Sequence, residues 1–198
     1  MDYKIKICGM KYSENIVEVA SLQPDFLGFI FYEKSKRYFD GIIPNLPKSI
    51  KKVGVFVNEN IDVILKKVSQ HQLNFVQLHG NESPNFCAEL HDKNIKIIKA
   101  FAVDDDFDFE QLIDYEVSCV YFLFDTKGKN PGGNGIVFNW DILNKYKSKK
   151  PLFLSGGIGE EEIKIINETT LPIFAIDINS KFEIEPGFKN IEKLKKII

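Results

Sequence analysis

Four side chains that can carry protons or charge stand at or near the ends of short apolar runs: Cys8, His79, Asp125 and Asp177. A cysteine thiolate and an aspartate carboxyl group can both serve in acid–base catalysis, so Cys8 and Asp125 are candidate catalytic residues. A carboxylate directly after Val-Tyr-Phe-Leu-Phe is costly to bury unless it is paired or used. Two structural alternatives stand beside this interpretation: Cys8 as a core residue, and Asp125 as the cap of the following loop.

The first apolar run also carries a charged residue, Lys6, two positions before Cys8. Side chains alternate between the two faces of a strand, so Lys6 and Cys8 lie on the same side. If Cys8 points into the protein, Lys6 is an interior ammonium, and a buried ammonium needs a carboxylate partner. Asp177, near the end of the last run, is the candidate partner.

Glycines and small polar residues follow three of the later runs. Gly156-Gly157 ends the seventh run, and Asn179-Ser180 follows the eighth. In barrels of alternating strands and helices, the loops after strands seven and eight often bind phosphate through backbone N–H groups, although a tight turn also favours adjacent glycines. A polar, glycine-rich stretch at residues 126–135 follows Asp125, and we expect it to form a lid over the site, with a plain surface loop as the alternative.

Composition and charge exclude several classes of function. The chain of 198 residues has 26 basic and 28 acidic side chains, a net charge of −2 and a pI near 6.0, which argues against a nucleic-acid partner. It contains no run of about 18 apolar residues, so we expect no membrane span. The first ten residues lack the apolar stretch of a secretory signal, and we expect an intracellular, cytoplasmic protein.

Metal, disulfide and nucleotide sites are also not indicated. The three histidines fall on separate elements without ligand spacing, and the three cysteines are widely spaced and odd in number. The usual glycine-rich nucleotide motifs are missing from the sequence. Only one of the 26 basic residues is arginine, Arg37, which suggests a position that lysine cannot serve.

The apolar runs themselves predict the fold. They are rich in Val, Ile and Phe, as buried parallel strands are, and they recur at regular intervals except for a longer gap between the sixth and seventh. Eight such units favour one (β/α)8 barrel domain over residues 1–198, rather than a doubly wound open sheet, which usually has fewer strands. The runs are Lys4–Gly9, Phe26–Phe31, Lys52–Val57, Phe75–Gly80, Ile95–Phe101, Val117–Asp125, Leu152–Gly157 and Ile173–Asn179.

Segments with helical spacing separate these runs. Asn60–His71 and Glu161–Thr169 each place apolar residues on one face. Ser83-Pro84 combines a capping hydroxyl with a proline at the first helical position. Asp104–Asp106 places negative charge where a helix through Tyr115 would begin. The stretch Ile42–Ile50 contains two prolines and is a poor helix.

Motifs in one order along residues 6–190 resemble those of the phosphoribosylanthranilate isomerases. They are Lys6-Ile7-Cys8-Gly9, Ser35-x-Arg37, Gln77-Leu78-His79-Gly80, Phe124-Asp125, Gly132-Gly133-Asn134-Gly135, Phe138-Asn139-Trp140, Leu154-Ser155-Gly156-Gly157, Asp177 and Pro186-Gly187-Phe188-Lys189-Asn190. The resemblance implies a cofactor-free (β/α)8 enzyme of tryptophan biosynthesis, a monomer or a homodimer. It would convert N-(5-phosphoribosyl)anthranilate to 1-(2-carboxyphenylamino)-1-deoxyribulose 5-phosphate by an Amadori rearrangement.

The resemblance also assigns roles to residues. Cys8 is the expected general base and Asp125 the general acid, so the thiol would need its pKa lowered below the usual value of about 8.5. Arg37 would bind the anthranilate carboxylate, since a planar guanidinium can take both oxygens in a fork. Asp177 would bind a ribose hydroxyl or orient Lys6. The remaining expected substrate-binding residues are His79, Gly156, Gly157, Asn179 and Ser180.

The sequence departs from the family pattern mainly at the phosphate end. Asn179-Ser180-Lys181 stands where the family usually has Ser-Ser-Gly, so one flexible glycine is lost and Lys181 adds a charge. Asn134, Asn139 and Gly159 replace the family's usual Thr, Asp and Asn. Related phosphosugar barrels are the first alternative, but they use metal ligands, or an aspartate where Cys8 stands. A barrel that only binds a phosphorylated ligand is the second.

Overall fold

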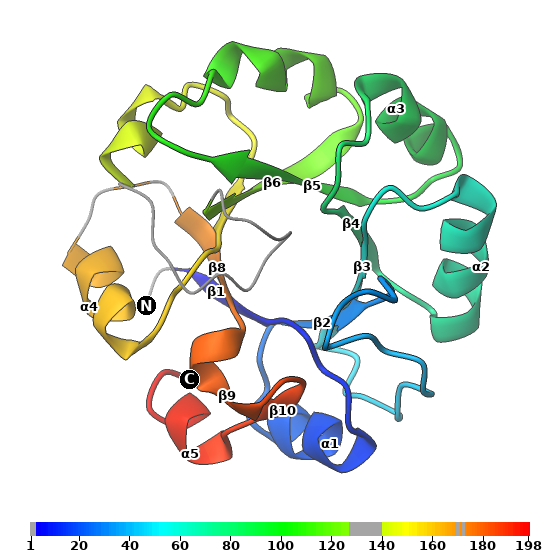
Figure 1. Ribbon diagram of the computed structural model, residues 1–198, viewed down its shortest axis with the longest axis vertical. Coiled ribbons are helices and arrows are strands. Elements are labelled where there is room, and N and C mark those ends of the chain that lie inside the picture. Colours follow the sequence, from blue (N-terminus) through cyan, green and yellow to red (C-terminus); the bar gives the residue numbers. More distant parts are fainter. Residues whose placement is uncertain (1–2, 127–139, 169–170, 172) are drawn as a thin grey trace.

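The computed structural model describes residues 3–126, 140–168, 171 and 173–198. Eight parallel strands form a closed barrel, and the first and last strands pair to close it. Figure 1 looks along the barrel, with the helices arranged around the ring of strands. Each strand overlaps one predicted run, so the predicted (β/α)8 barrel is confirmed. The strands are β1 Lys4–Ile7, β2 Phe26–Ile30, β3 Lys51–Phe56, β4 Phe75–Leu78, β5 Ile97–Val103, β6 Cys119–Thr126, β7 Leu152–Leu154 and β8 Ile173–Ile178.

Four α-helices follow β1, β3, β4 and β7: α1 Ser13–Ser21, α2 Ile61–His71, α3 Pro84–Asp92 and α4 Glu160–Glu168. The expected helix starts at Asn60 and Ser83 are confirmed, since Asn60 accepts a hydrogen bond from Asp62 N–H and Ser83 from Phe86 N–H. No helix forms over residues 42–50, as expected from the prolines.

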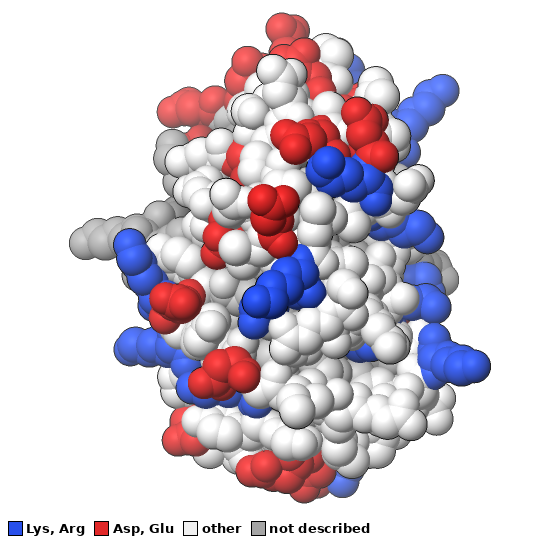
Figure 2. Space-filling model, turned by 90° about the vertical axis from the view of Figure 1, so that its right-hand side faces the viewer, with Lys and Arg blue, Asp and Glu red and all other residues white. Residues whose placement is uncertain are grey.

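The connection between β5 and β6 differs from the prediction. Its helix is the 3₁₀-helix η1, Phe109–Tyr115, and its cap is Asp108 rather than a residue of 104–106. Asp108 accepts from Glu110 N–H, so the local side-chain bond, not the run of negative charge, fixes where the helix begins. Figure 2 shows acidic side chains gathered at this end of the molecule.

After β8 come small elements that lie at the edge of the barrel, between α4 and α1 (Figure 1). The 3₁₀-helix η3 Ser180–Phe182 is followed by the two-stranded hairpin β9 Glu183–Glu185 and β10 Phe188–Lys189, and then by α5 Ile191–Leu194. A further 3₁₀-helix, η2 Trp140–Lys145, precedes β7. Among the described residues, no helix has the length and apolar character needed to cross a membrane.

The barrel interior changes character from one end to the other. Its N-terminal end is filled by aromatic rings from the starts of the strands, with Tyr121 stacked on Phe174 at 5.0 Å between ring centres and Phe26 edge-on to Phe153 at 5.3 Å. A larger apolar cluster packs between the strands and the helices outside. Polar side chains occupy the C-terminal end of the interior, where barrels of this class keep their sites.

Candidate active site

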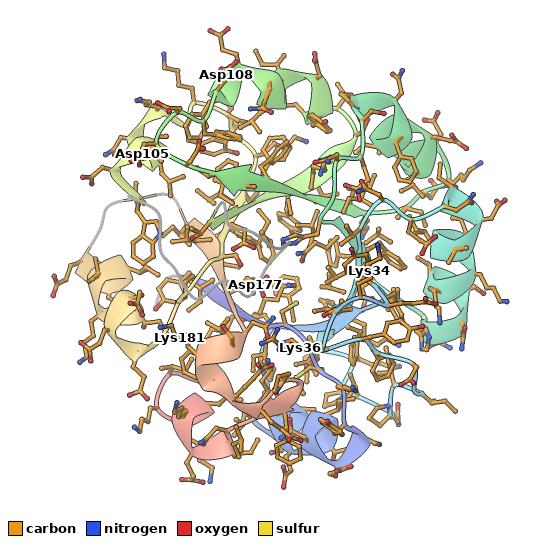
Figure 3. The ribbon with its side chains drawn as sticks, in the orientation of Figure 1. Lys34, Lys36, Asp105, Asp108, Asp177 and Lys181 are labelled. Carbon is orange, nitrogen blue, oxygen red and sulfur yellow. The ribbon has the colours of Figure 1, made fainter. Side chains whose placement is uncertain are left out.

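A cavity of about 560 Å³ opens at the C-terminal mouth of the barrel. Its size suits a small-molecule ligand. Every residue predicted for the site lines this one cavity: Cys8, Arg37, His79, Asp125, Gly156, Gly157, Asp177, Asn179 and Ser180. Figure 3 shows Asp177 inside the ring of strands, whereas Asp105 and Asp108 lie at its outer rim.

The predicted pair of Lys6 and Asp177 is confirmed. Lys6 on β1 and Asp177 on β8 are partners in the barrel register, and Nζ lies 2.8 Å from Oδ2. Both side chains are buried. Burial lowers the pKa of Lys6, but Asp177 and Cys8 outweigh it, so the pKa rises and the ammonium persists. Burial raises the pKa of Asp177 against the opposing effect of Lys6. Its Oδ1 has no hydrogen-bond partner among the described residues.

Cys8 follows β1 and is held there by its N–H, which donates to Ile178 O at 2.9 Å. Gly28 on β2 makes room for the sulfur, because a Cβ at Gly28 would lie 2.8 Å from Cys8 Sγ. The lowered thiol pKa that a general base would need is not a property of the free protein. Burial raises the pKa of Cys8, and the cations of Lys6 and Lys189 only partly oppose this effect.

Asp125, near the end of β6, forms a chain of contacts with His79, which follows β4, and through it with Gln77 of β4. His79 Nε2 lies 3.2 Å from Asp125 Oδ2, and Gln77 Nε2 lies 2.7 Å from His79 Nδ1. With the Gln77 amide donating to Nδ1, the imidazole carries its proton on Nε2 and donates it to Asp125. The other carboxylate oxygen accepts from Thr126 N–H at 2.9 Å. Gly156, with φ +95°, is required here because a Cβ would lie 2.9 Å from Asp125 Oδ1.

Arg37 reaches the mouth from the loop after β2, where Ser35 Oγ accepts from its N–H at 3.1 Å. Its guanidinium forms a fork with Glu183 of β9: Nε lies 2.8 and 3.0 Å from the two oxygens, and Nη2 lies 2.6 Å from Oε2. Lys189 of β10 also donates to Glu183, at 2.7 Å. In the free protein the Arg37 fork therefore binds a carboxylate of the chain itself, and the predicted fork to the anthranilate carboxylate stays a prediction.

The part of the cavity that was predicted to bind phosphate is built from the loops after β7 and β8. Gly156 and Gly157 both have positive φ and line the cavity together with Ser180. Asn179 lines it too, but its Oδ1 accepts from Lys189 Nζ at 2.7 Å, so this side of the amide is already used. Figure 3 places Lys181 between α4 and η3, outside the ring that holds Asp177.

One predicted feature lies outside the described residues, and several residues of the site had no predicted role. The glycine-rich stretch expected as a lid lies, apart from Thr126, outside the described residues. Gln77, Glu183, Lys34 and Lys36 contact or line the site without a predicted role. Figure 3 shows the two lysines on the β2–β3 loop beside the cavity. Among the described residues, no three His, Cys, Asp or Glu side chains gather as a metal site would require.

The barrel and this cavity have the arrangement of a (β/α)8 enzyme, with a thiol and a carboxyl group lining one cavity at the C-terminal mouth. The family model for N-(5'-phosphoribosyl)anthranilate isomerase matches residues 5–198. The isomerase of that name from Parabacteroides distasonis is 47% identical over 98% of this chain and 91% of its own length.

Two solved structures agree in fold. Monomers generated from the dimeric phosphoribosylanthranilate isomerase of Thermotoga maritima superpose with a TM-score of 0.80 at 32% identity, covering 98% of this chain and 95% of theirs. A phosphoribosylanthranilate isomerase in complex with reduced 1-(o-carboxyphenylamino)-1-deoxyribulose 5-phosphate gives 0.82 at 34%, with the same coverage. The chain belongs to the N-(5'-phosphoribosyl)anthranilate isomerase family. It isomerises N-(5'-phosphoribosyl)anthranilate in tryptophan biosynthesis.

Proposed function

We propose that Cys8 and Asp125 carry out this isomerisation as general base and general acid. The reaction is an aldose–ketose isomerisation, an intramolecular oxidoreduction in which C1 of the ribose is reduced and C2 is oxidised. The observation that supports the assignment best is that a thiol and a carboxyl group line one cavity, together with the chain's single arginine. The cavity also contains the backbone glycines and the cations that a substrate with a phosphate and a carboxylate requires.

The proton transfers follow from the chemistry of the substrate. Asp125 delivers a proton to the furanose oxygen, the C1–O bond breaks, and a cationic Schiff base forms between C1 and the anthranilate nitrogen. Cys8 removes the proton from C2, and the electron pair of that C–H bond forms the C1–C2 double bond of an enolamine. The enolamine then loses its C2 hydroxyl proton and gains a proton at C1, which gives the ketone. Neither an oxidant nor a cofactor is needed for this balance.

His79 is proposed to support Asp125. After the proton has left, the carboxylate retains two donors, the imidazole Nε2–H at 3.2 Å and Thr126 N–H at 2.9 Å. Both donors stabilise the negative charge that appears on Asp125. Gln77 holds the imidazole in the tautomer that donates to Asp125.

Cys8 has to become a thiolate although burial raises the pKa of its thiol. Besides the more weakly acting Lys189, two positive charges oppose that effect during the reaction. One is the Lys6 ammonium, which is fixed in the wall, and the other is the Schiff base cation, which ring opening creates next to C2. We infer that the base is activated when the intermediate forms and is mostly a thiol in the free enzyme.

The remaining predicted residues divide between the two anionic ends and the sugar. Arg37 is proposed to bind the anthranilate carboxylate, and Gly156, Gly157, Asn179 and Ser180 surround the phosphate. Asp177 Oδ1, which has no partner among the described residues, would accept a hydrogen bond from a ribose hydroxyl.

Two isosteric variants test the catalytic assignment. Cys8→Ser and Asp125→Asn should each lower kcat by about 10² to 10⁴-fold, because each removes one acid–base group. Circular dichroism and thermal unfolding should match the unaltered protein. Near-normal turnover in both variants would show that the assignment is wrong. Growth of a tryptophan auxotroph lacking the isomerase tests the second candidate function, since a barrel that only binds a phosphorylated ligand could not restore growth.

We propose a cytoplasmic enzyme that acts as a monomer or a homodimer. Every predicted site residue comes from one chain, so either state leaves the site complete. If the site does not depend on the oligomeric state, the specific activity should be constant from nanomolar to micromolar enzyme. Sedimentation analysis over the same range would show which state is present.

A further inference from the structure

The carboxylate of Glu183 is fully engaged, and its partners come from two distant segments. Oε1 accepts from Arg37 Nε at 2.8 Å, Lys189 Nζ at 2.7 Å and Gly187 N–H at 3.0 Å, and Oε2 accepts from Arg37. The side chain is 4% exposed. Burial would raise the pKa of Glu183, but Arg37 and Lys189 outweigh it and lower the pKa. Glu183 is therefore an ionised buried carboxylate that fixes one edge of the Arg37 guanidinium.

Lys189 is the second buried cation of this cluster. Its side chain is fully buried, and its Nζ donates to Glu183 and to the Oδ1 and backbone oxygen of Asn179, at 2.7, 2.7 and 3.5 Å. Three acceptors around a buried nitrogen suit an ammonium, which has three protons. Burial lowers the pKa of Lys189 to about 8 in spite of Glu183, so the group is still mainly protonated at neutral pH.

The charges of the cluster do not cancel. Arg37 and Lys189 are cations and Glu183 is the carboxylate between them, so one positive charge is left over at the wall of the cavity. A carboxylate of the substrate would balance it. Without Lys189, Arg37 and Glu183 would form a closed neutral pair with little attraction for a second carboxylate.

We propose that Glu183 and Lys189 are positioning residues for the substrate's carboxylate. Glu183 holds Arg37 by its Nε–Nη2 edge, so that the rest of the fork faces the cavity, and Lys189 supplies the charge that leaves Arg37 able to attract an anion. This inference rests on the role proposed above for Arg37. It assigns to the hairpin of β9 and β10 a function in substrate selection.

Glu183→Gln and Lys189→Met test the inference by two measurements. The first is steady-state kinetics with N-(5'-phosphoribosyl)anthranilate, in which each variant should raise KM by about tenfold while kcat changes by less than about twofold. The second compares Kd for reduced 1-(o-carboxyphenylamino)-1-deoxyribulose 5-phosphate with Kd for its carboxamide counterpart. The unaltered protein should prefer the carboxylate. Lys189→Met should lose most of that preference, because the spare positive charge is removed. Glu183→Gln should lose part of it, because Arg37 keeps its charge but is no longer held in place. Lys189→Arg should restore part of it.

The controls separate the proposed role from a general effect of lost charge and from a purely structural role. Lys195→Met removes a cation from the same C-terminal segment, but from an exposed pair with Glu192, and should change neither KM nor the preference. If Glu183→Gln and Lys189→Met weaken both ligands equally, the cluster is only structural and the inference is overturned. If Arg37→Lys leaves the preference intact, the proposed role of Arg37 itself fails. If the Lys189→Met protein does not fold, the test rests on Glu183→Gln. An unchanged preference of that variant for the carboxylate ligand over the carboxamide would also overturn the inference.

Discussion

Two buried lysines, Lys99 and Lys189, each pair with a glutamate but differ in their other partners. Lys99 of β5 donates to three backbone carbonyls, of Leu78, Gly80 and Ala100, and to Glu82 Oε2 at 3.0 Å. Glu82 in turn accepts from the N–H groups of Asn58 and Gly80. Lys189 donates mainly to side chains, and those side chains contact Arg37 or line the cavity.

This difference shows that burial and pairing alone do not reveal what a lysine does. A lysine that donates to main-chain carbonyls connects two neighbouring strand ends. Its loss leaves buried carbonyl groups without hydrogen-bond partners. A lysine that binds side chains of a cavity wall sets the charge and the position of those side chains. Loss of the first kind of lysine should lower the free energy of unfolding. Loss of the second kind should change which ligand the protein prefers.

The largest effect is expected from Lys99→Met. Breaking a buried ion pair leaves Glu82 as an uncompensated charge, so the free energy of unfolding should fall by about 3–5 kcal/mol. The kcat/KM of the folded fraction should change much less. Urea unfolding monitored by circular dichroism, together with kinetics well below the transition, would measure both. A Lys99→Met protein that is stable but inactive would contradict the assignment of Lys99 to stability and of Lys189 to ligand binding.

Lys6→Met should produce the next largest effect, because it removes the cation nearest to the Cys8 thiol. We expect kcat to fall by about 10- to 100-fold, and alkylation of Cys8 by iodoacetamide to require higher pH. Asp177→Asn should move the alkylation profile the opposite way, since the Asp177 charge raises the pKa of Cys8. Two shifts in the same direction would contradict the charge argument.

Two glycines, Gly9 and Gly54, show the same difference between a position beside the cavity and a position in the core. Gly9 has φ +76°, and a Cβ there would lie 2.7 Å from Arg37 Cδ and 2.8 Å from Asn179 Oδ1. Gly9→Ala should therefore displace Arg37 and raise KM by about tenfold. Gly54 on β3 packs against Phe56 and Leu73 instead, away from the cavity. Gly54→Ala should cost about 1–3 kcal/mol of stability with KM unchanged. Equal KM values for the two variants would contradict this assignment.

The smallest effect is expected from pH. The Lys189 ammonium, with a pKa of about 8, is lost as the pH rises through that value, and the spare positive charge disappears with it. KM should rise severalfold, about two- to fivefold, between pH 7 and 9, because carboxylate binding requires the protonated form. The charged groups that face Lys189 are Glu183, Cys8 and Arg37, and Cys8 also titrates at high pH. Lys189→Met keeps Cys8, so a KM that rises equally in that variant would assign the effect to the thiol.

The sequence predicted the barrel because its strands are fully buried and therefore read as continuous apolar runs. It predicted the site because strand ends of a barrel converge on one mouth, which brings Cys8, Asp125 and Asp177 together. The pair of Lys6 and Asp177 followed from strand alternation together with the need of a buried ammonium for a carboxylate partner. The partner of Arg37 could not be predicted in this way, since Glu183 is 146 positions away on an extra hairpin outside the repeating units. The pKa of Cys8 depends on the balance of burial and charge, which spacing along a sequence does not contain.

The contact between Lys6 and Asp177 also constrains the order of folding. The two residues are 171 positions apart, on the strands that close the barrel. During synthesis β1 leaves the ribosome long before β8 exists, and until then entry of β1 into a barrel would bury an ammonium without a partner. Closure is therefore expected to be a late event that waits for the last strand. Nascent chains that end before residue 177 should remain open, with their apolar surface exposed to chaperones.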